Sequence, residues 1–246
     1  MSSSLFQILN ISRQDMMNRL TNLDVAANNL ANVNTNGYKA SRSNFQELLD
    51  AGSKEGITIS GTQVLAQQGT LETSDNPLDW AIQGEGFFQV QLADGSTAYT
   101  RNGEFLLDAD NNLVTSSGYK LVWDGQIPDN MSDLSVQEDG TVQAQLSDGT
   151  SEVIGTVQLA RFTNPTALIN LGDNLWGESE ASGAAQVVDP NASNGWISSH
   201  AVEQSNVDLT REMTNLMSLQ RNFQMSARTF QQTDDMISIA LNLRKG

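Results

Sequence analysis

The chain has 246 residues and no cysteine, and it carries 29 acidic against 13 basic residues, a formal net charge of −16. That length is enough for one or two domains with a sizeable core. The acidic balance excludes nucleic acid as a partner, because no basic patch is available to neutralise phosphates. The lack of cysteine excludes disulfides and thiol chemistry, and no apolar run approaches the length that spans a membrane.

The charge is unevenly distributed. Residues 1–40 carry three basic and two acidic side chains, and residues 201–246 carry five of each. The other five basic and 22 acidic residues lie in 41–200, which gives this region a net charge of −17. Amphipathic helices often balance their charges, which is one explanation for the near-neutral ends. The other is that the ends are crowded together, where like charges within about 8 Å would repel.

Residues 4–34 have the spacing of a helix. Apolar residues recur there every seven positions, at Leu9, Met16, Leu23 and Leu30. Such spacing predicts a helix that packs along another helix with a slight supercoil. Asn34, Asn36 and Gly37 then end it, because Asn and Gly tolerate the left-handed conformation of a helix C-terminus.

The middle of the chain alternates with a period of two. Five turn dipeptides interrupt the alternation: Asp94-Gly95, Asn102-Gly103, Asp124-Gly125, Asp139-Gly140 and Asp148-Gly149. Asp-Gly and Asn-Gly between alternating apolar residues are strong hairpin signals. Residues 76–176 are therefore predicted to form an antiparallel β domain. The polar segment 41–75 is expected to be extended linking structure, and 177–201, rich in small and polar residues, a return linker.

The last segment repeats the spacing of the first. Its series of seven-spaced apolar residues is Val202, Leu209, Leu216, Phe223, Phe230 and Ile237. A helix is expected from about 208 to 243, roughly 50 Å long, with Asp208 as its N-cap. Each apolar seam needs a cover. The cover is either the other helix, together with neighbouring molecules, or the β domain's own face as in many α+β proteins.

No catalytic, cofactor-binding or metal-binding set is predicted. His200 is the single histidine, whereas a zinc site needs three or four ligands. Asp108 opens a segment that starts like a calcium loop, but Leu113 stands where that loop needs glycine. The four tryptophans raise an alternative of another class, a cell-wall glycan-binding β module. They are more simply explained as core or interface residues.

Several longer stretches resemble the bacterial flagellar axial proteins, those of the basal-body rod and the hook. The matching stretches are "LDVAANNLANVNTNGYK" (23–39), "NPLDWAIQGEGFFQV" (76–90), "YTRNGEFLLDADNNLV" (99–114), "GDNLW" (172–176) and "VEQSNVDLTREMTNLMSLQRNFQMSARTFQQTDDM" (202–236). They follow one another in the order expected of that family. The individual residues that match its motifs are Asn28, Asn29, Leu30, Ala31, Asn32, Thr35, Gly37, Tyr38, Gly84, Gly86, Phe87, Phe88, Ser205, Asn206 and Val207.

The resemblance implies a structural subunit rather than an enzyme, with no cofactor. Such proteins are exported by the flagellar type III export apparatus to the basal body, outside the cytoplasmic membrane. There they assemble with copies of themselves and with neighbouring rod and hook subunits into a helical tube around a channel, and transmit torque from motor to hook. The fold class implied is α+β, an antiparallel β-rich central domain whose N- and C-terminal helices pair as a coiled coil in the polymer.

The same resemblance gives each segment a role. Residues 1–40 and 202–246 would be the inner-core helices, 41–75 the linking segment, 76–176 the outer β domain and 177–201 the return linker. The residues expected to make the inner core are Leu9, Met16, Leu23, Leu30, Leu209, Leu216, Phe223, Phe230 and Ile237.

The subtype is less sharply defined. The chain is most similar to subunits of the distal rod, but its segment between Phe45 and Leu71 is shorter than expected for them. "DAGSKEGI" (50–57) is instead reminiscent of hook proteins, whose additional outer domains have no room in 246 residues. A proximal rod subunit and a short hook-type subunit remain the alternatives.

Overall fold

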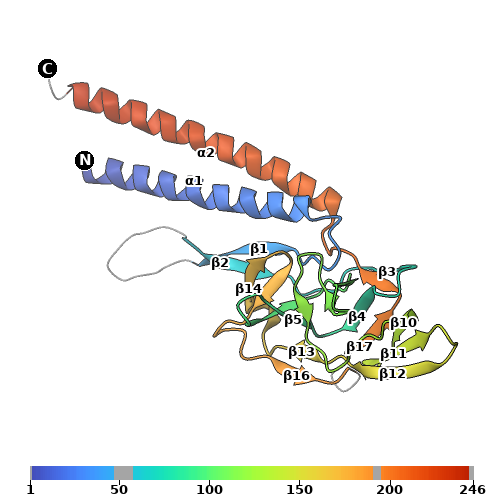
Figure 1. The fold of residues 1–246 in the computed structure, drawn as a ribbon. Helices are drawn as coiled ribbons and strands as arrows, with labels where there is room; N and C mark the ends of the chain where they lie inside the picture. Colours follow the sequence, from blue (N-terminus) through green and yellow to red (C-terminus); the bar gives the residue numbers. More distant parts are fainter. Residues whose placement is uncertain (1, 47–57, 191–194, 244–246) are drawn as a thin grey trace. The chain divides into compact units, whose positions relative to one another are not determined.

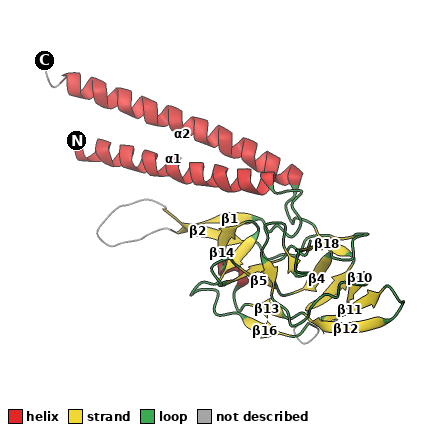
Figure 2. Cartoon of the chain, in the orientation of Figure 1, coloured by secondary structure: helices red, strands yellow, loops and turns green. Residues whose placement is uncertain are grey.

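The computed structural model of the chain describes residues 2–46, 58–190 and 195–243. Two compact units make up the structure. The helix unit comprises residues 1–31, 41–63 and 207–246, and the β unit comprises 32–40 and 64–206. The chain therefore passes between the units four times, at 31/32, 40/41, 63/64 and 206/207. Figure 1 follows the chain through its elements, and Figure 2 separates helices from strands.

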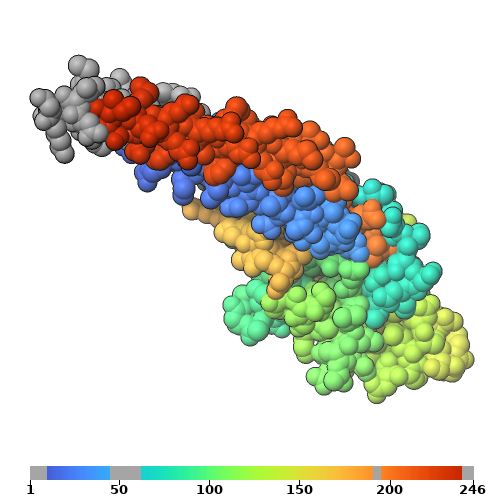
Figure 3. All heavy atoms as spheres, turned by 90° about the horizontal axis from the view of Figure 1, so that it is seen from above, coloured from blue at the N-terminus to red at the C-terminus, as the bar shows by residue number. Residues whose placement is uncertain are grey.

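The helix unit contains α1 (Ser2–Ala31) and α2 (Leu209–Leu243), which lie side by side and run antiparallel (Figures 1 and 3). Helices were expected in both places. At the start of α2, Oδ1 of Asp208 accepts a hydrogen bond from the Arg211 N–H at 3.0 Å. This confirms Asp208 as the N-cap, which satisfies one of the backbone donors that a helix start leaves free.

The first helix ends at Ala31, three residues before the expected Asn34. Asn32 begins a turn instead. Its carbonyl accepts the Thr35 N–H at 3.1 Å, and its side-chain Oδ1 accepts the Thr35 hydroxyl at 3.2 Å. Such local bonds of Asn and Thr compete with the helical pattern, so the helix stops where they form.

Two strands complete the helix unit. β1 (Ser41–Gln46) pairs with β2 (Thr58–Val64), and β1 contacts α1. Between the two strands, Nη2 of Arg42 donates to Oε1 of Gln63 at 2.8 Å.

In the β unit, the strand pairs with described registers are all antiparallel. A curled seven-stranded sheet has the order β14-β15-β6-β5-β9-β8-β7, a second sheet has the order β10-β11-β12, and the remaining pairs are β13-β16, β17-β4 and β18-β3. This confirms the expected β-rich antiparallel architecture. The bounds are β3 Leu71–Thr73, β4 Trp80–Gly84, β5 Phe88–Gln91, β6 Thr97–Thr100, β7 Leu106–Leu107, β8 Leu113–Val114, β9 Lys120–Leu121, β10 Met131–Val136, β11 Thr141–Leu146, β12 Ser151–Thr156, β13 Leu159–Arg161, a 3-10 turn η1 Pro165–Ala167, β14 Ile169–Gly172, β15 Leu175–Gly177, β16 Gln186–Val188, β17 Gly195–Ser199 and β18 Ala201–Glu203.

Three of the five turn dipeptides form the expected hairpins. Asp94 lies between β5 and β6, Asp139 between β10 and β11, and Asp148 between β11 and β12. In each turn the aspartate carboxylate accepts the backbone N–H two residues further on at 2.9 Å. These bonds, with those of the neighbouring hydroxyl groups, lower the pKa of all three carboxyl groups.

The other two dipeptides are not hairpin turns, and the expectation for them was wrong. β6 and β7, on either side of Asn102-Gly103, pair with other strands. A Cβ at Gly103 would overlap the Trp80 carbonyl oxygen, and one at Gly125 would overlap the Trp123 ring. Glycine is therefore present at Gly103 because the backbone of β4 approaches closely, and at Gly125 because the ring of Trp123, two residues earlier, lies against it.

Residues 177–201, expected to be a return linker, contribute strands to the β unit. Residues 186–188 pair with β13, and 195–199 pair with β4 along their full length. Ala201 then begins β18, which pairs with β3. "QVV" and "GWISS" are too short to carry a clear alternation, and their strands are defined by their distant partners.

The core of the β unit combines aliphatic side chains with several aromatic rings. Trp80, Phe88 and Phe105 are fully buried. The ring centroid of Phe105 lies 5.5 Å from that of Trp80 and 5.3 Å from that of Phe88, and both pairs are arranged edge to face. A second cluster gathers Phe87, Phe162 and Trp176 with their neighbours. Among the described residues, neither helix combines the length and apolar character that crossing a membrane requires.

Candidate functional site

The predicted seam residues of the two helices are mostly half-buried. This holds for Met16, Leu23 and Leu30 in α1 and for Leu216, Phe223, Phe230 and Ile237 in α2. Leu209 differs, since it is 47% exposed, and the side chain of Leu9 lies outside the described residues. Because α1 and α2 contact each other along their length, we infer that the half-buried seam faces the partner helix.

A hydrogen bond between Asp15 of α1 and Ser226 of α2 joins the two helices, and Arg19 of α1 pairs with the same carboxylate. Oδ2 of Asp15 accepts from Nε of Arg19 at 2.8 Å and from the hydroxyl of Ser226 at 2.7 Å. Partial burial acts to raise the pKa of Asp15, but these bonds outweigh it and hold the pKa below its usual value. Their stabilising effect is therefore present at neutral pH and is lost as acid protonates the carboxylate.

A second set of apolar residues on the helices is exposed. Its members in the described part are Ile11, Met17, Leu20, Leu209, Met213, Met217, Met225, Met236 and Ile239, each between 43% and 63% exposed. Except for Leu209, their positions differ from those of the seam, so each helix is apolar both toward its partner and away from it. Figure 3 shows the two helices side by side in a space-filling view. A surface of this kind marks a protein–protein contact.

The asparagine motif lies where α1 ends. Asn29 is buried, and its side chain bonds both N–H and C=O of Ser41, at 2.9 and 2.8 Å. Its amide also donates to Oε1 of Glu212 in α2 at 3.1 Å. Asn29 thus links α1, β1 and α2 within the helix unit, whereas Asn32 acts in the turn. Asn28 and Ala31 are exposed on the last turn of α1.

The two terminal motifs meet in the β unit. The Gly37 N–H donates to the Glu203 carbonyl at 2.6 Å, and the Asn206 N–H donates to the Tyr38 carbonyl at 3.4 Å. The Asn206 side chain accepts the Ala40 N–H at 2.7 Å. Ser205 and Val207, the neighbours of Asn206 in the motif, are half-buried. The sequence indicated both motifs but not that they pair.

Three charged side chains are buried beside this meeting point. Lys39, Arg101 and Glu203 are 1%, 4% and 2% exposed. Nζ of Lys39 lies 2.5 Å from Oε1 of Glu203, and Nη1 of Arg101 lies 3.5 Å from Oε2. Burial lowers the pKa of both basic groups, and the Glu203 carboxylate opposes that shift. Sequence reasoning missed this cluster; the lysine at the end of the first motif and the glutamate at the start of the last were its only signals.

Replacing Gly37 by alanine is expected to destabilise the β unit strongly. Gly37 has φ +69°, and a Cβ would overlap the backbone of Asn102. Gly95 has φ +84° with open space around it, so Gly95→Ala serves as the matched control and should cost about 1–2 kcal/mol. For Gly37→Ala we expect on the order of 3 kcal/mol or more. Denaturant titration followed by tryptophan fluorescence measures both; equal losses would contradict the crowding argument.

The glycines and phenylalanines of the central motif are structural. Gly84 and Gly86 both have positive φ, and a Cβ at Gly86 would press against the Leu159 side chain. Phe87 and Phe88 are buried in the two aromatic clusters. The motif therefore shapes the bend between β4 and β5 and supplies core residues.

The described residues hold no group of three or more His, Cys, Asp or Glu side chains placed to bind a metal ion. Nε2 of His200 lies 4.0 Å from Asp133, and its Nδ1 lies 3.1 Å from the Ser199 hydroxyl. The carboxylate of Asp108 accepts the Asp110 and Asn112 N–H groups at 2.9 and 2.8 Å, which makes this segment the turn between β7 and β8.

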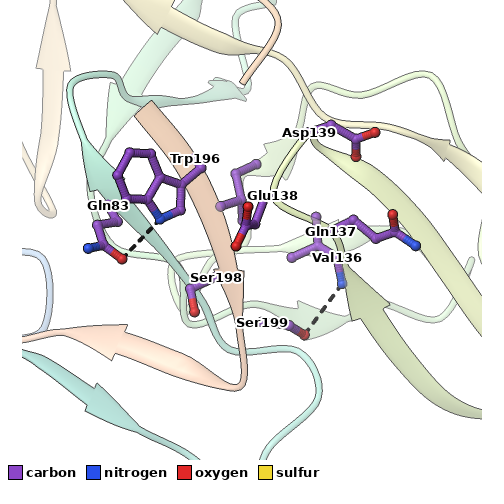
Figure 4. Close-up of a pocket in the computed structure, with 9 residues that line it drawn as sticks. Gln83, Val136, Gln137, Glu138, Asp139, Trp196, Ser198 and Ser199 are labelled. Atoms are coloured by element: carbon purple, nitrogen blue, oxygen red, sulfur yellow. Dashed lines mark hydrogen bonds between the residues drawn. The ribbon is translucent and has the colours of Figure 1, made fainter. Parts of the chain in front are cut away.

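The tryptophans are mainly core residues. Trp80 and Trp176 are buried, and Trp123 packs against the core. Trp196 is 36% exposed beside an open groove of about 580 Å³, where its Nε1 donates to Oε1 of Gln83 at 3.0 Å. Figure 4 shows Trp196 and Gln83 on one side of this groove and Glu138 and Asp139 across it. One partly exposed ring gives little support to a glycan-binding module.

Three protein-family models match the chain. They are "Flagella basal body rod protein" at residues 9–39, "Flagellar hook protein FlgE/F/G D1 domain" at 81–144 and "Flagellar basal body rod FlgEFG protein C-terminal" at 198–243. The first and last matches contain most of α1, all of α2 and the motifs that pair through Gly37, Tyr38 and Asn206. With the antiparallel β unit between them, they define the class as an axial protein of the bacterial flagellum.

Curated relatives narrow the class. The flagellar basal-body rod protein FlgG of Agrobacterium fabrum is 36% identical, with 94% of this chain and 97% of the relative covered. The FlgG protein of Caulobacter vibrioides is 36% identical, with 97% of this chain and 99% of the relative covered. That of Bacillus subtilis is 35% identical, with 94% of this chain and 96% of the relative covered. The chain belongs to the FlgG family of flagellar basal-body rod proteins, the structural subunits of the distal rod.

Membership of this family decides between the distal rod and the alternatives left by the sequence, which were a proximal rod subunit, a hook-type subunit and a glycan-binding module. The relatives extend over most of this chain as rod proteins of the FlgG type, which favours the distal rod over the proximal rod and hook. The family is structural and is not known as a family of enzymes. It places the chain in the flagellar basal body, outside the cytoplasmic membrane.

Proposed function

We propose that copies of this chain polymerise into a helical tube whose inner wall is made by α1 and α2, paired as a coiled coil, and whose outer wall is made by the β unit. The tube surrounds the export channel and transmits torque from the motor to the hook. Its neighbours along the axis are other rod subunits and hook subunits. The residues proposed to make the inner wall are those of the seam, from Leu9 to Leu30 in α1 and from Leu209 to Ile237 in α2.

The observation that carries this proposal is the double-sided apolar character of the helix pair. Phe223 and Phe230 are half-buried, while Met217 and Met225 are 52% and 59% exposed. Burying one large apolar side chain stabilises by about 1.5–3 kcal/mol. Summed over several residues on each helix, the exposed set offers enough free energy to order the helices against neighbouring copies.

The chain segments take the roles that the resemblance implies. The helices within residues 1–40 and 202–246 supply the inner core, and 41–75 links it to the β domain at 76–176, to which 177–201 adds strands. Passage through the type III export apparatus requires an extended chain, so the helices become ordered on assembly. Ordering on binding couples folding to polymerisation.

Limited trypsin digestion tests the proposal. In the monomer, helices of this length receive little stabilisation apart from their mutual contact, so we expect cleavage after Arg13, Arg221 and Arg228 before cleavage within the β unit. In the polymer, the same sites should be protected. Lys120, whose side chain is 50% exposed in the β unit, is the internal control that polymerisation leaves accessible. Equal rates of helix cleavage in monomer and polymer would refute the inner-wall assignment.

A further inference from the structure

The three buried charged residues beside the terminal motifs form a defined group together with the half-buried Asn206; this group of Lys39, Arg101, Glu203 and Asn206 is called the crossing cluster. All four belong to the β unit. Glu203 is its centre. Its Oε1 accepts from Nζ of Lys39 and from the Gly69 N–H, the latter at 2.8 Å, and its Oε2 lies 3.5 Å from Nη1 of Arg101. Its backbone carbonyl accepts the Gly37 N–H.

Asn206 completes the group from the neighbouring turn of chain. Its Nδ2 donates to the Leu65 carbonyl and to the Gln67 carbonyl, both at 2.9 Å. Its Oδ1 accepts the Ala40 N–H. Lys39 also donates to the Gln67 carbonyl at 2.8 Å. The side chains of Lys39, Glu203 and Asn206 thereby join three segments that are distant in sequence: 37–40, 65–69 and 203–206.

These three segments are the ones at which the chain passes between the units. Asn206 lies directly at the passage 206/207. Its side chain bonds Ala40, at the passage 40/41, and Leu65, close to the passage 63/64. The passage at 31/32 leads through a short turn to Gly37, which Glu203 holds. Three of the four covalent connections between the units therefore reach the β unit at the crossing cluster, whereas the fourth is also held by Glu104 and Asn174 through Asn36.

Arg101 attaches this group to the sheet. Its Nη2 donates to the Gly84 carbonyl at 2.6 Å and its Nη1 to the Ile82 carbonyl at 3.3 Å, both in β4. Its guanidinium carbon lies 5.3 Å from the Phe87 ring centroid, a cation–π contact. Any displacement of residues 37–40 or 203–206 is thus resisted by the core of the β unit.

Buried charges are a poor means of gaining stability, because desolvation offsets most of their attraction. What they supply is geometry, since moving one partner leaves another charge buried and unpaired. We propose that Glu203 and Asn206 are positioning residues that fix the chain crossings at 40/41, 63/64 and 206/207 on the β unit and so carry torque between the helical inner wall and the β unit. This inference rests on the proposed function of the chain in the rod.

The test uses the full chain, expressed in cells that lack their own copy of the gene. Asn206→Asp keeps the acceptor for Ala40 but removes both amide donors, and Glu203→Gln removes the counter-charge of Lys39 and Arg101. Glu72→Gln is the matched control, because Glu72 is an exposed glutamate on β3, the strand that pairs with β18. Val142→Ala, a core substitution in β11 outside the crossing cluster, controls for a general loss of stability.

Three quantities are measured: basal bodies by electron microscopy, the unfolding midpoint of each purified chain, and swimming speed in media of increasing viscosity. We expect Asn206→Asp to assemble rods yet lose speed with viscosity more steeply than Glu72→Gln, and more steeply than Val142→Ala at equal stability. If speed follows the unfolding midpoint in all variants, the residues act through stability alone and the proposal is overturned.

The other outcomes are also decisive. Should Glu203→Gln fail to fold, the test rests on Asn206→Asp. The decrease of its swimming speed with viscosity then decides whether the inference holds. Viscosity dependence like that of the control, in rods that assemble normally, refutes the inference while leaving the proposed function intact. If the unaltered chain fails to restore rods to these cells, it is the proposed function that fails.

Discussion

Replacing Phe230 by aspartate should abolish polymerisation and motility while leaving the β unit folded. Phe230 is half-buried in α2 on the face that we assign to the partner helix. Its loss removes about 1.5–3 kcal/mol of burial per copy, and the new carboxylate would in addition be buried without a partner in the assembled wall. Because each copy in a polymer repeats the defect, partial assembly is not expected. Phe223→Asp should behave in the same way.

The adjacent position provides the control. Gln231 is exposed on the same turn of α2, so Gln231→Asp introduces the same charge without removing the seam contact. Sedimentation and electron microscopy of purified chains, with a motility assay in cells, measure assembly, and tryptophan fluorescence reports the β unit. Normal motility of both phenylalanine variants would exclude the two helices from the inner wall.

Phe88→Ala should destabilise the β unit itself, whereas Phe230→Asp should stop assembly and leave the β unit folded. Phe88 is fully buried, and its ring meets that of Phe105 edge to face. Loss of a buried phenylalanine costs about 3–5 kcal/mol, because a cavity remains where the ring was. Such a loss is a large fraction of the stability of an ordinary domain.

A residue of the same strand controls for this substitution. Gln91 ends β5 with an exposed side chain, and Gln91→Ala should change the free energy of unfolding by no more than about 0.5 kcal/mol. Urea titration of the intact chain measures both variants. If Phe88→Ala unfolds at the same urea concentration as Gln91→Ala, the aromatic cluster is not the core that stabilises the β unit.

Local signals in the sequence predicted local structure well. The seven-residue spacing and Asp208 defined α2 because a helix is built from neighbours in sequence. Asp94, Asp139 and Asp148 defined hairpins because an Asp-Gly turn carries its own hydrogen bond. The prediction failed at Asn102-Gly103 and Asp124-Gly125 for a physical reason. Glycine is needed there because Trp80 and Trp123 leave no room for a Cβ, and not because the chain forms a hairpin turn.

Features that depend on distant partners were not predictable in this way. Lys39 and Glu203 are separated by 164 positions, and nothing near either residue reveals that they become buried together. The pairing of 195–199 with β4 is equally hidden, because its small residues acquire strand character only beside that partner. The family motifs marked several of these positions but gave no reason for their charge or burial.

The long-range pairing of the β unit has a consequence for the order in which it forms. The hairpins β5-β6, β10-β11 and β11-β12 close short loops and can form as soon as their residues are free, because the entropy of loop closure grows with length. β3 and β4 must instead wait for β18 and β17, more than a hundred residues later. A chain that emerges from a narrow channel with its N-terminus first would therefore hold several finished hairpins on an open framework. Only the arrival of residues 195–206 would close it, and this late, non-local step is the one that should set the rate at which a new subunit matures.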